Sequence, residues 1–468
     1  MLNKHTSEFL RNVCNQIKYK KIHKDISNEL IMHIDEIKDE YIKKGMPEEE
    51  AVKKAVEQMG NPIEIGKSLN KTHKPKLEWS IIILVGMLIA AGVGVLFSLV
   101  NDAAFLSTLS IRINNDLSVS MKGLIKLYLL YTSLGISFLL AFYFLDYTTL
   151  EKYSLHIFLA SIAFLFITSY FLPSEYIYKY IGIKDVRFSP VSIAMPFLLI
   201  SFSGLLTRWM TGNRGDSLKI FGLGALAILI CLIHISRVNN VILIHESIVN
   251  TFILICVFLV MITIAIIDKR FKGNKKLFLF YTYGSVVSSV GGFLFFYVRP
   301  RKYLVERLMD ILNPSTDPTS YGFIYMCIKK VLYGSKMFGK GDGVYFNNGE
   351  RFLVPSSESD FIFTYIVSTF GWIAGIAIVI IALVTIIRML FTVKKIHSTY
   401  GKYIMSSITI AFSLQIAANI LMNLGMFPLM EAALPLISYG GVSFIINMGL
   451  IGLLLGIYRR KDLILSTE

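Results

Sequence analysis

The sequence predicts an all-α polytopic membrane protein with about ten transmembrane helices, preceded by a small cytoplasmic helical domain. Hydrophobic residues make up 54% of the 468 residues and charged residues only 17%, a balance typical of chains that lie largely in lipid. The apolar residues fall in runs of about 20, the length that a helix needs to cross the hydrocarbon core. The beginning of the chain is polar and has the periodicity of soluble helices.

Residues 1–76 are predicted to form the small helical domain. Leu30, Ile34 and Ile37 recur at helical spacing, and Gly45 is placed to end their helix. Pro47, followed by three glutamates, is typical of the start of a second helix. The first residues of the chain contain no apolar core, so we do not expect a cleavable signal peptide.

Residues 77–468 are predicted to form the membrane domain. Its expected spans are residues 79–100, 124–145, 155–172, 190–206, 218–235, 248–267, 277–298, 361–387, 403–425 and 434–458. The connections on one side of these spans are rich in lysine and arginine, which marks the cytoplasmic side. Both termini are therefore expected in the cytoplasm. The net charge of +15 then follows from membrane topology and gives no reason to expect nucleic-acid binding.

One long connection, residues 299–359, is expected on the opposite, extracytoplasmic side. It is basic, with Arg299, Arg301, Lys302, Arg307, Lys329, Lys330, Lys336, Lys340 and Arg351. Two interpretations fit this charge: attraction to anionic lipid headgroups, or a site for a phosphate-bearing substrate. A glycine-rich run at residues 334–343 would let backbone N–H groups approach an anion, but its spacing is not that of a P-loop.

Asp360 stands where this polar connection meets the next apolar run, in the segment Phe352-Leu-Val-Pro-Ser-Ser-Glu-Ser-Asp-Phe-Ile-Phe363. A carboxylate in that place can accept the unpaired N–H groups of a helix's first turn. It can also act on a substrate that arrives at the membrane surface. The residues alone leave both interpretations open.

The four cysteines, Cys14, Cys231, Cys256 and Cys327, have no metal-ligand or Cys-x-x-Cys spacing. We therefore expect neither a disulfide framework nor a zinc site. No other metal-ligand pattern is evident, and no metal ligands are predicted. The His245-Glu-Ser-Ile-Val run lacks the second histidine of a zinc motif.

The second half of the chain resembles a known family. The run Leu434-Pro-Leu-Ile-Ser-Tyr-Gly-Gly-Val-Ser443 is similar to the signature Pro-x-x-Gly-x-x-Leu-Pro-Phe-x-Ser-Tyr-Gly-Gly-x-Ser of the SEDS family, which contains FtsW, RodA and SpoVE. Further matching pieces are Arg307 with Leu312-Asn-Pro-Ser-Thr-Asp-Pro318, the glycines of 339–343, Pro355, and Asp360-Phe-Ile-Phe363. The resemblance extends from about residue 299 to 460. Residues 8–70 resemble the small helical HAAS domain, which implies interaction or regulation.

The resemblance implies that the chain polymerises the peptidoglycan precursor lipid II into glycan strands. The reaction would take place at the outer face of the bacterial cytoplasmic membrane, usually beside a class B penicillin-binding protein. The family's essential aspartate corresponds to Asp360, which would act as general base. Arg307, and after it Lys340, would stabilise the undecaprenyl diphosphate leaving group. The remaining predicted substrate-binding residues are Gly339, Gly341, Pro355, Ser438, Gly440 and Gly441. No cofactor is implied, and a divalent-cation requirement is left open.

Several positions depart from the family pattern and indicate a divergent branch. Glu431 and Leu436 replace a glycine and a phenylalanine of the signature, and Ser368-Thr369 stands where the family often has two glutamates. Two alternatives to the transferase are a non-catalytic scaffold for a penicillin-binding protein and a transporter of lipid-linked precursor. The run Ser438-Tyr-Gly-Gly441 could serve close helix packing or line a lipid groove.

Overall fold

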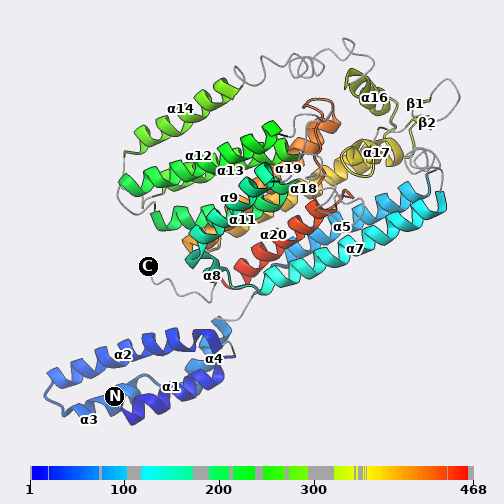
Figure 1. The fold of residues 1–468 in the computed structure, drawn as a ribbon. Coiled ribbons are helices and arrows are strands. Elements are labelled where there is room, and N and C mark those ends of the chain that lie inside the picture. The colour runs from blue at the N-terminus through cyan, green and yellow to red at the C-terminus, as the bar shows by residue number, and fades with distance from the viewer. Residues whose placement is uncertain are drawn as a thin grey trace. The chain divides into compact units, whose positions relative to one another are not determined.

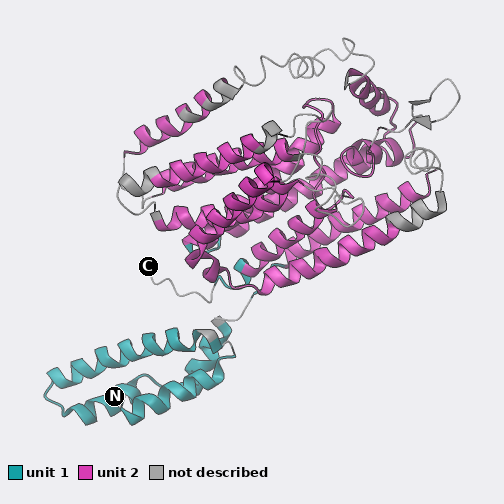
Figure 2. Cartoon of the chain, in the orientation of Figure 1, with its two compact units in different colours: residues 1–78, 395–398, 457–468 teal, residues 79–394, 399–456 magenta. Residues whose placement is uncertain are grey.

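The computed structural model describes residues 3–18, 20–72, 76–102, 117–171, 189–209, 214–237, 246–268, 274–293, 321–341, 344–345, 351–352, 354, 356–439 and 441–461. The chain divides into two compact units (Figure 2). One contains Met1–Glu78, Lys395–Ser398 and Ile457–Glu468, and the other contains Trp79–Lys394 and Thr399–Gly456.

The first unit is built on four α-helices. They are α1 (Lys4–Gln16), α2 (His23–Lys43), α3 (Glu48–Gln58) and α4 (Pro62–Thr72), with a short 3-10 helix η1 (Lys20–Ile22) between α1 and α2. Helix α1 packs against α4, and α2 packs against α3. Phe9, Val13, Ile26 and Ile34 are buried in their common core. Gly45 follows α2 with φ of 88°, a left-handed conformation that glycine adopts without strain after a helix.

The second unit is helical as well (Figure 1). Its elements are α5 (Trp79–Val100), α7 (Leu117–Phe144), α8 (Tyr147–Lys152), α9 (Ser154–Phe171), α11 (Pro190–Trp209), α12 (Arg214–Arg237), α13 (Glu246–Ile267), α14 (Lys275–Phe293), α16 (Tyr321–Tyr333), β1 (Val344–Tyr345), β2 (Arg351–Phe352), α17 (Ile362–Phe370), α18 (Trp372–Lys394), α19 (Thr399–Asn423) and α20 (Val442–Arg459). The two short strands pair antiparallel, with Val344 opposite Phe352.

The predicted all-α membrane fold is confirmed. Within the described ranges, 8 helices are long and apolar enough to cross a membrane: α5, α7, α9, α11, α13, α18, α19 and α20. Helices α12 and α14 lie at the two other expected spans, and α12 contains the shorter apolar stretch Lys219–Ile233. The long connection before α17 is not a simple loop, because it contains α16 and the β1–β2 pair.

The expected span 361–387 is wrong in one respect, because it is not a single helix. Helix α17 ends at Phe370 and α18 begins at Trp372, with Gly371 between them at φ of 93°. A β-carbon on Gly371 would lie 2.7 Å from the carbonyl oxygen of Met337. The break therefore needs a glycine both for its backbone angle and for the close approach of another segment.

The last expected span, 434–458, also begins later than predicted. Helix α20 starts at Val442, and residues 434–439 form a non-helical turn segment. Leu436 in this segment has φ of 68° and is buried, which a leucine adopts only when the surrounding structure holds it there. The Pro435 ring that follows Leu434 removes one amide donor and disfavours a helix at this point.

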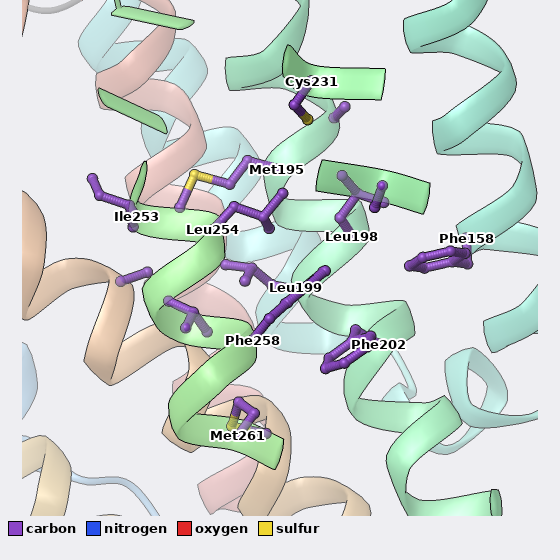
Figure 3. Packing of buried hydrophobic residues seen from close by; sticks show 14 of the residues in the cluster. Phe158, Met195, Leu198, Leu199, Phe202, Cys231, Ile253, Leu254, Phe258 and Met261 are labelled. Carbon is purple, nitrogen blue, oxygen red and sulfur yellow. The ribbon is translucent and has the colours of Figure 1, made fainter. Parts of the chain in front are cut away.

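A large buried core lies among α9, α11, α12, α13 and α19. Figure 3 shows its centre, where the rings of Phe202 on α11 and Phe258 on α13 stack with centroids 3.9 Å apart. Helix α11 begins with Pro190 after Ser189, whose hydroxyl accepts the N–H of Val191 at 3.2 Å. Such a cap satisfies a first-turn amide that would otherwise be buried without a partner.

Helices α7 and α20 approach each other closely through glycines. A β-carbon on Gly452 would overlap the carbonyl oxygen of Leu139, and one on Gly456 would lie 2.7 Å from that of Tyr143. Small residues spaced four apart let membrane helices pack backbone to backbone. Among the described glycines of the last span, these two make the backbone-to-backbone approach, and both lie further along α20 than Gly441.

Candidate functional site

Asp360 lies in a tight turn immediately before α17. The N–H groups of Ser359 and Phe361 donate to the carbonyl of Ser356, at 3.0 and 3.1 Å. Ser356 has φ of 58°, a left-handed conformation that is uncommon outside glycine and often marks a constrained site. Phe361 occupies the N-cap position of α17, which begins at Ile362, so Asp360 lies in the turn two residues before the first residue of the helix.

Two asparagines of α19 hold this turn. The side-chain amide nitrogens of Asn419 and Asn423 each donate to the carbonyl oxygen of Asp360, both at 2.9 Å. Asn419 also donates to the carbonyl of Ala432. Asn423 accepts, through its side-chain oxygen, the backbone N–H of Thr364 at 2.9 Å. The first-turn amide of Thr364 is thus satisfied by Asn423 and not by Asp360.

The signature segment before α20 binds the other side of the same turn. The Ser438 hydroxyl donates to the carbonyl of Ser359 at 2.7 Å, and the Tyr439 N–H donates to the carbonyl of Glu358 at 3.0 Å. Ser438 also accepts the N–H of Leu434 at 2.7 Å. The Ser438 hydroxyl therefore joins two loops beside Asp360, and a role of this residue in binding a substrate stays a prediction.

Three tyrosines gather next to this junction. The ring of Tyr439 lies 6.4 Å from that of Tyr128 and 5.9 Å from that of Tyr131, both on α7. Gly441, at φ of 48°, turns the chain past Tyr131, whose Cζ would lie 3.4 Å from a β-carbon on the glycine. Burial, with smaller contributions from Tyr131 and Glu358, raises the pKa of the Tyr439 phenol, so this side chain stays neutral.

The glycine-rich segment lies against the break between α17 and α18. Four backbone hydrogen bonds join them: Gly341 N–H to Ser368 O (2.9 Å), Gly339 N–H to Phe370 O (3.1 Å), Trp372 N–H to Lys336 O (3.0 Å) and Ile373 N–H to Met337 O (3.1 Å). These bonds replace the helical ones that the break removes. The N–H groups of Gly339 and Gly341 are thus occupied by α17. A direct role of either glycine in binding a substrate stays a prediction.

Lys340 stands between those two glycines with its side chain largely exposed. Its Nζ lies 3.6 Å from Oδ2 of Asp102, a buried carboxylate just after α5. A second link joins α5 to α17, because the hydroxyls of Ser98 and Tyr365 lie 3.1 Å apart. The Lys340 segment is bonded to the end of α17, and the Asp360 turn precedes its beginning. The two therefore lie at opposite ends of the same short helix.

Three predicted site residues, Arg307, Pro355 and Gly440, lie outside the described residues, as does the Leu312–Pro318 run. Among the described residues, no group of three or more histidine, cysteine or acidic side chains could hold a metal ion. The four cysteines are free. The sequence reasoning missed the role of Asn423 and gave none to Asn419. Two asparagines one helical turn apart in an apolar span were the available signal, because buried polar groups in a membrane need partners.

A family model matches nearly the whole chain that follows the first unit. The sequence model of FtsW/RodA/SpoVE, described as "Cell cycle protein", matches residues 79–463. A "Probable peptidoglycan glycosyltransferase FtsW" of Trichlorobacter lovleyi is 29% identical over 165 residues, which is 35% of this chain and 43% of that protein. The "Peptidoglycan glycosyltransferase MrdB" of Escherichia coli K12 is 24% identical over 162 residues, 35% of this chain and 44% of that protein. The matched part thus spans less than half of either relative.

A solved structure shares the fold. Its chain, described as "Structural coordination of polymerization and crosslinking by a peptidoglycan synthase complex", matches with a TM-score of 0.59 at 17% identity. The match covers 82% of this chain and 98% of the solved chain. The arrangement of helices is therefore shared far more widely than the sequence.

Proposed function

The chain belongs to the FtsW/RodA/SpoVE family of multi-pass membrane proteins, and from this membership we propose that it polymerises lipid II into peptidoglycan glycan strands. The relatives named as peptidoglycan glycosyltransferases support the reaction class. The 8 apolar helices among the described residues support a location in the bacterial cytoplasmic membrane, with both termini in the cytoplasm and the Asp360 turn at the outer face. Residues 1–76 form a cytoplasmic domain that interacts with or regulates the membrane part.

The observation that carries this proposal is the construction around Asp360. The carbonyls of Ser359 and Asp360 are bonded by Ser438 and by the two α19 asparagines, and the N–H of Phe361 is bonded within the turn. Three backbone groups around one carboxylate are thus fixed by three separate parts of the chain. Such fixed placement is what a general base requires.

In the proposed reaction, the 4-hydroxyl oxygen of the acceptor sugar attacks the anomeric carbon of the donor. A new C–O bond forms while the bond from that carbon to the diphosphate oxygen breaks, which inverts the anomeric centre. Asp360 accepts the hydroxyl proton. The undecaprenyl diphosphate leaves with its electron pair, and the charge of Lys340, together with Arg307, stabilises it. Gly339, Gly341, Pro355, Ser438, Gly440 and Gly441 are the further proposed substrate-binding positions.

We propose a class B penicillin-binding protein as the partner that crosslinks the strands. The solved chain is described in terms of polymerization and crosslinking by a peptidoglycan synthase complex. This description supports a partner of this kind. The alternative function is a non-catalytic scaffold for the same partner. The polymerisation experiment that follows distinguishes this scaffold from the transferase.

The experiment measures glycan polymerisation from labelled lipid II by the purified protein, alone and with the candidate partner. Native protein and Asp360→Asn are compared, since the substitution keeps shape and removes only basicity. Polymer from the native form alone supports the transferase with Asp360 as its base. No polymer from either form, with partner binding intact, establishes the scaffold. Polymer from both forms removes Asp360 from the role of base.

A further inference from the structure

We propose that Asn423, together with Asn419, is a positioning residue for Asp360. The two side chains fix the peptide group that follows Asp360 and the first turn of α17, and so determine where the carboxylate lies. This inference rests on the proposed transferase function, and it assigns to α19 a part in the reaction beyond spanning the membrane.

The contacts of Asn423 use its whole amide. Its nitrogen donates to the carbonyls of Asp360 and Asn419, both at 2.9 Å. Its oxygen accepts the N–H of Thr364 at 2.9 Å and the hydroxyl of Thr364 at 2.8 Å. An amide has two donor hydrogens and two acceptor lone pairs, so every one is used. The residue is 0% exposed, so bulk solvent does not reach it to replace any of these partners.

Asn419 repeats the arrangement one helical turn earlier. It is also 0% exposed, and its nitrogen donates to the carbonyls of Asp360 and Ala432. The carbonyl of Asp360 therefore accepts two hydrogen bonds from one face of α19. Ala432 belongs to the segment that leads to Ser438, so the same pair of asparagines bonds both loops at the site.

A purely structural role would need only the oxygen of Asn423, which satisfies the first turn of α17. The donors to Asp360 are a separate feature, because they act on the residue whose carboxylate is proposed to take the proton. Loss of these donors removes two hydrogen bonds from the carbonyl of Asp360, and the turn then shifts to a different position. A displacement of about 1 Å of a reacting group can lower a rate by about 100-fold.

The test separates the donor from the acceptor. Asn423→Asp keeps the size of the side chain and an oxygen for Thr364, but replaces the nitrogen that donates to Asp360. We expect its kcat for lipid II polymerisation to fall about 10- to 100-fold while KM stays near the native value, because the substrate-binding groups are untouched. The matched control is Thr409→Val on the same helix: Thr409 is 0% exposed, and its hydroxyl bonds only its own helix, at Met405. We expect Thr409→Val to keep the native kcat while its unfolding temperature is comparable to that of Asn423→Asp.

Asn419→Ala is the second variant, because it removes one donor to Asp360 and leaves the Thr364 cap intact. Its kcat is also expected to fall, by less than that of Asn423→Asp. Native kcat in either folded asparagine variant overturns the positioning role and leaves the transferase proposal in place. A fall in kcat that Thr409→Val reproduces also overturns it, since general loosening of α19 would then be the cause. A native protein without polymerising activity overturns both proposals together.

Discussion

Lys340 and Asp102 form an ion pair of unequal exposure: their charged atoms lie 3.6 Å apart, with the lysine side chain 57% and the aspartate side chain 6% exposed. The carboxylate comes from the end of α5 and the ammonium from the segment bonded to the end of α17. A partly exposed pair of this kind contributes little to stability. Its effect is to hold one positive charge in place at the surface of the site.

The first prediction concerns that charge. Lys340→Gln should lower kcat/KM for lipid II about tenfold, because a cation that stabilises a leaving diphosphate acts most strongly in the transition state. Lys340→Arg should recover most of the loss, since it keeps the charge. Lys330→Gln, which removes an exposed positive charge from α16, is the control in a polymerisation assay. An equal loss in both glutamine variants would indicate a general effect of net charge.

The second prediction concerns the break between α17 and α18. Gly371→Ala should destabilise the protein by about 2 kcal/mol, because alanine is strained at φ of 93° and its β-carbon meets the carbonyl of Met337. Thermal unfolding in detergent measures the change. Gly86→Ala in α5, where no atom lies within 4 Å of an added β-carbon, should leave the unfolding temperature unchanged or slightly higher. Equal unfolding temperatures for the two variants would contradict the prediction.

The third prediction concerns the contact of α7 with α20. Gly452→Ala should separate the two helices, since its β-carbon would overlap the carbonyl of Leu139. We expect a loss of about 1–3 kcal/mol, as in other overpacked contacts, visible as a lower unfolding temperature. Gly284→Ala in α14 has open space around its added β-carbon and serves as the comparison. A native unfolding temperature for Gly452→Ala would show that these helices are not in close contact.

The fourth prediction concerns orientation. Tyr333 is 95% exposed at the end of α16, and a cysteine introduced there should react with a membrane-impermeant maleimide added to intact cells. Lys44→Cys in the first unit should react only after the cells are opened. Labelling of Lys44→Cys in intact cells would reverse the proposed topology.

The native thiol of Cys327 gives a related prediction on pH. Burial raises the pKa of this thiol, against a smaller opposing effect of Lys330. Because the thiolate is the reactive form, Cys327 should react with the maleimide slowly at neutral pH and faster as the pH rises.

The sequence predicted the membrane fold well because its signal is local. An apolar run such as Trp79–Val100 is a complete helix, and its expected bounds agree with α5. The failures occurred where a distant segment decides the structure. Nothing in the apolar run around Gly371 shows that residues 336–341 will bond the exposed backbone there, so one long helix was the natural expectation.

The candidate site could likewise be predicted only in part from the sequence. Asp360 could be singled out because a motif surrounds it in the chain, whereas the groups that hold it come from residues 59 and 63 positions later. The polarity of Asn419 and Asn423 was visible, but only the folded chain shows that both face one carbonyl. The amides of Gly339 and Gly341 donate to α17, a structural role that the sequence did not show, and their predicted role in binding a substrate stays a prediction.

Helix α17 is only 9 residues long, and its length separates the two halves of the site. At 1.5 Å per residue the helix extends about 14 Å, with the Asp360 turn at its beginning and the Lys340 segment at its end. A molecule that contacts both backbones must bridge roughly that distance, which exceeds a single sugar ring. For the proposed transferase, we expect this spacing to favour an extended headgroup of several linked units over a monosaccharide.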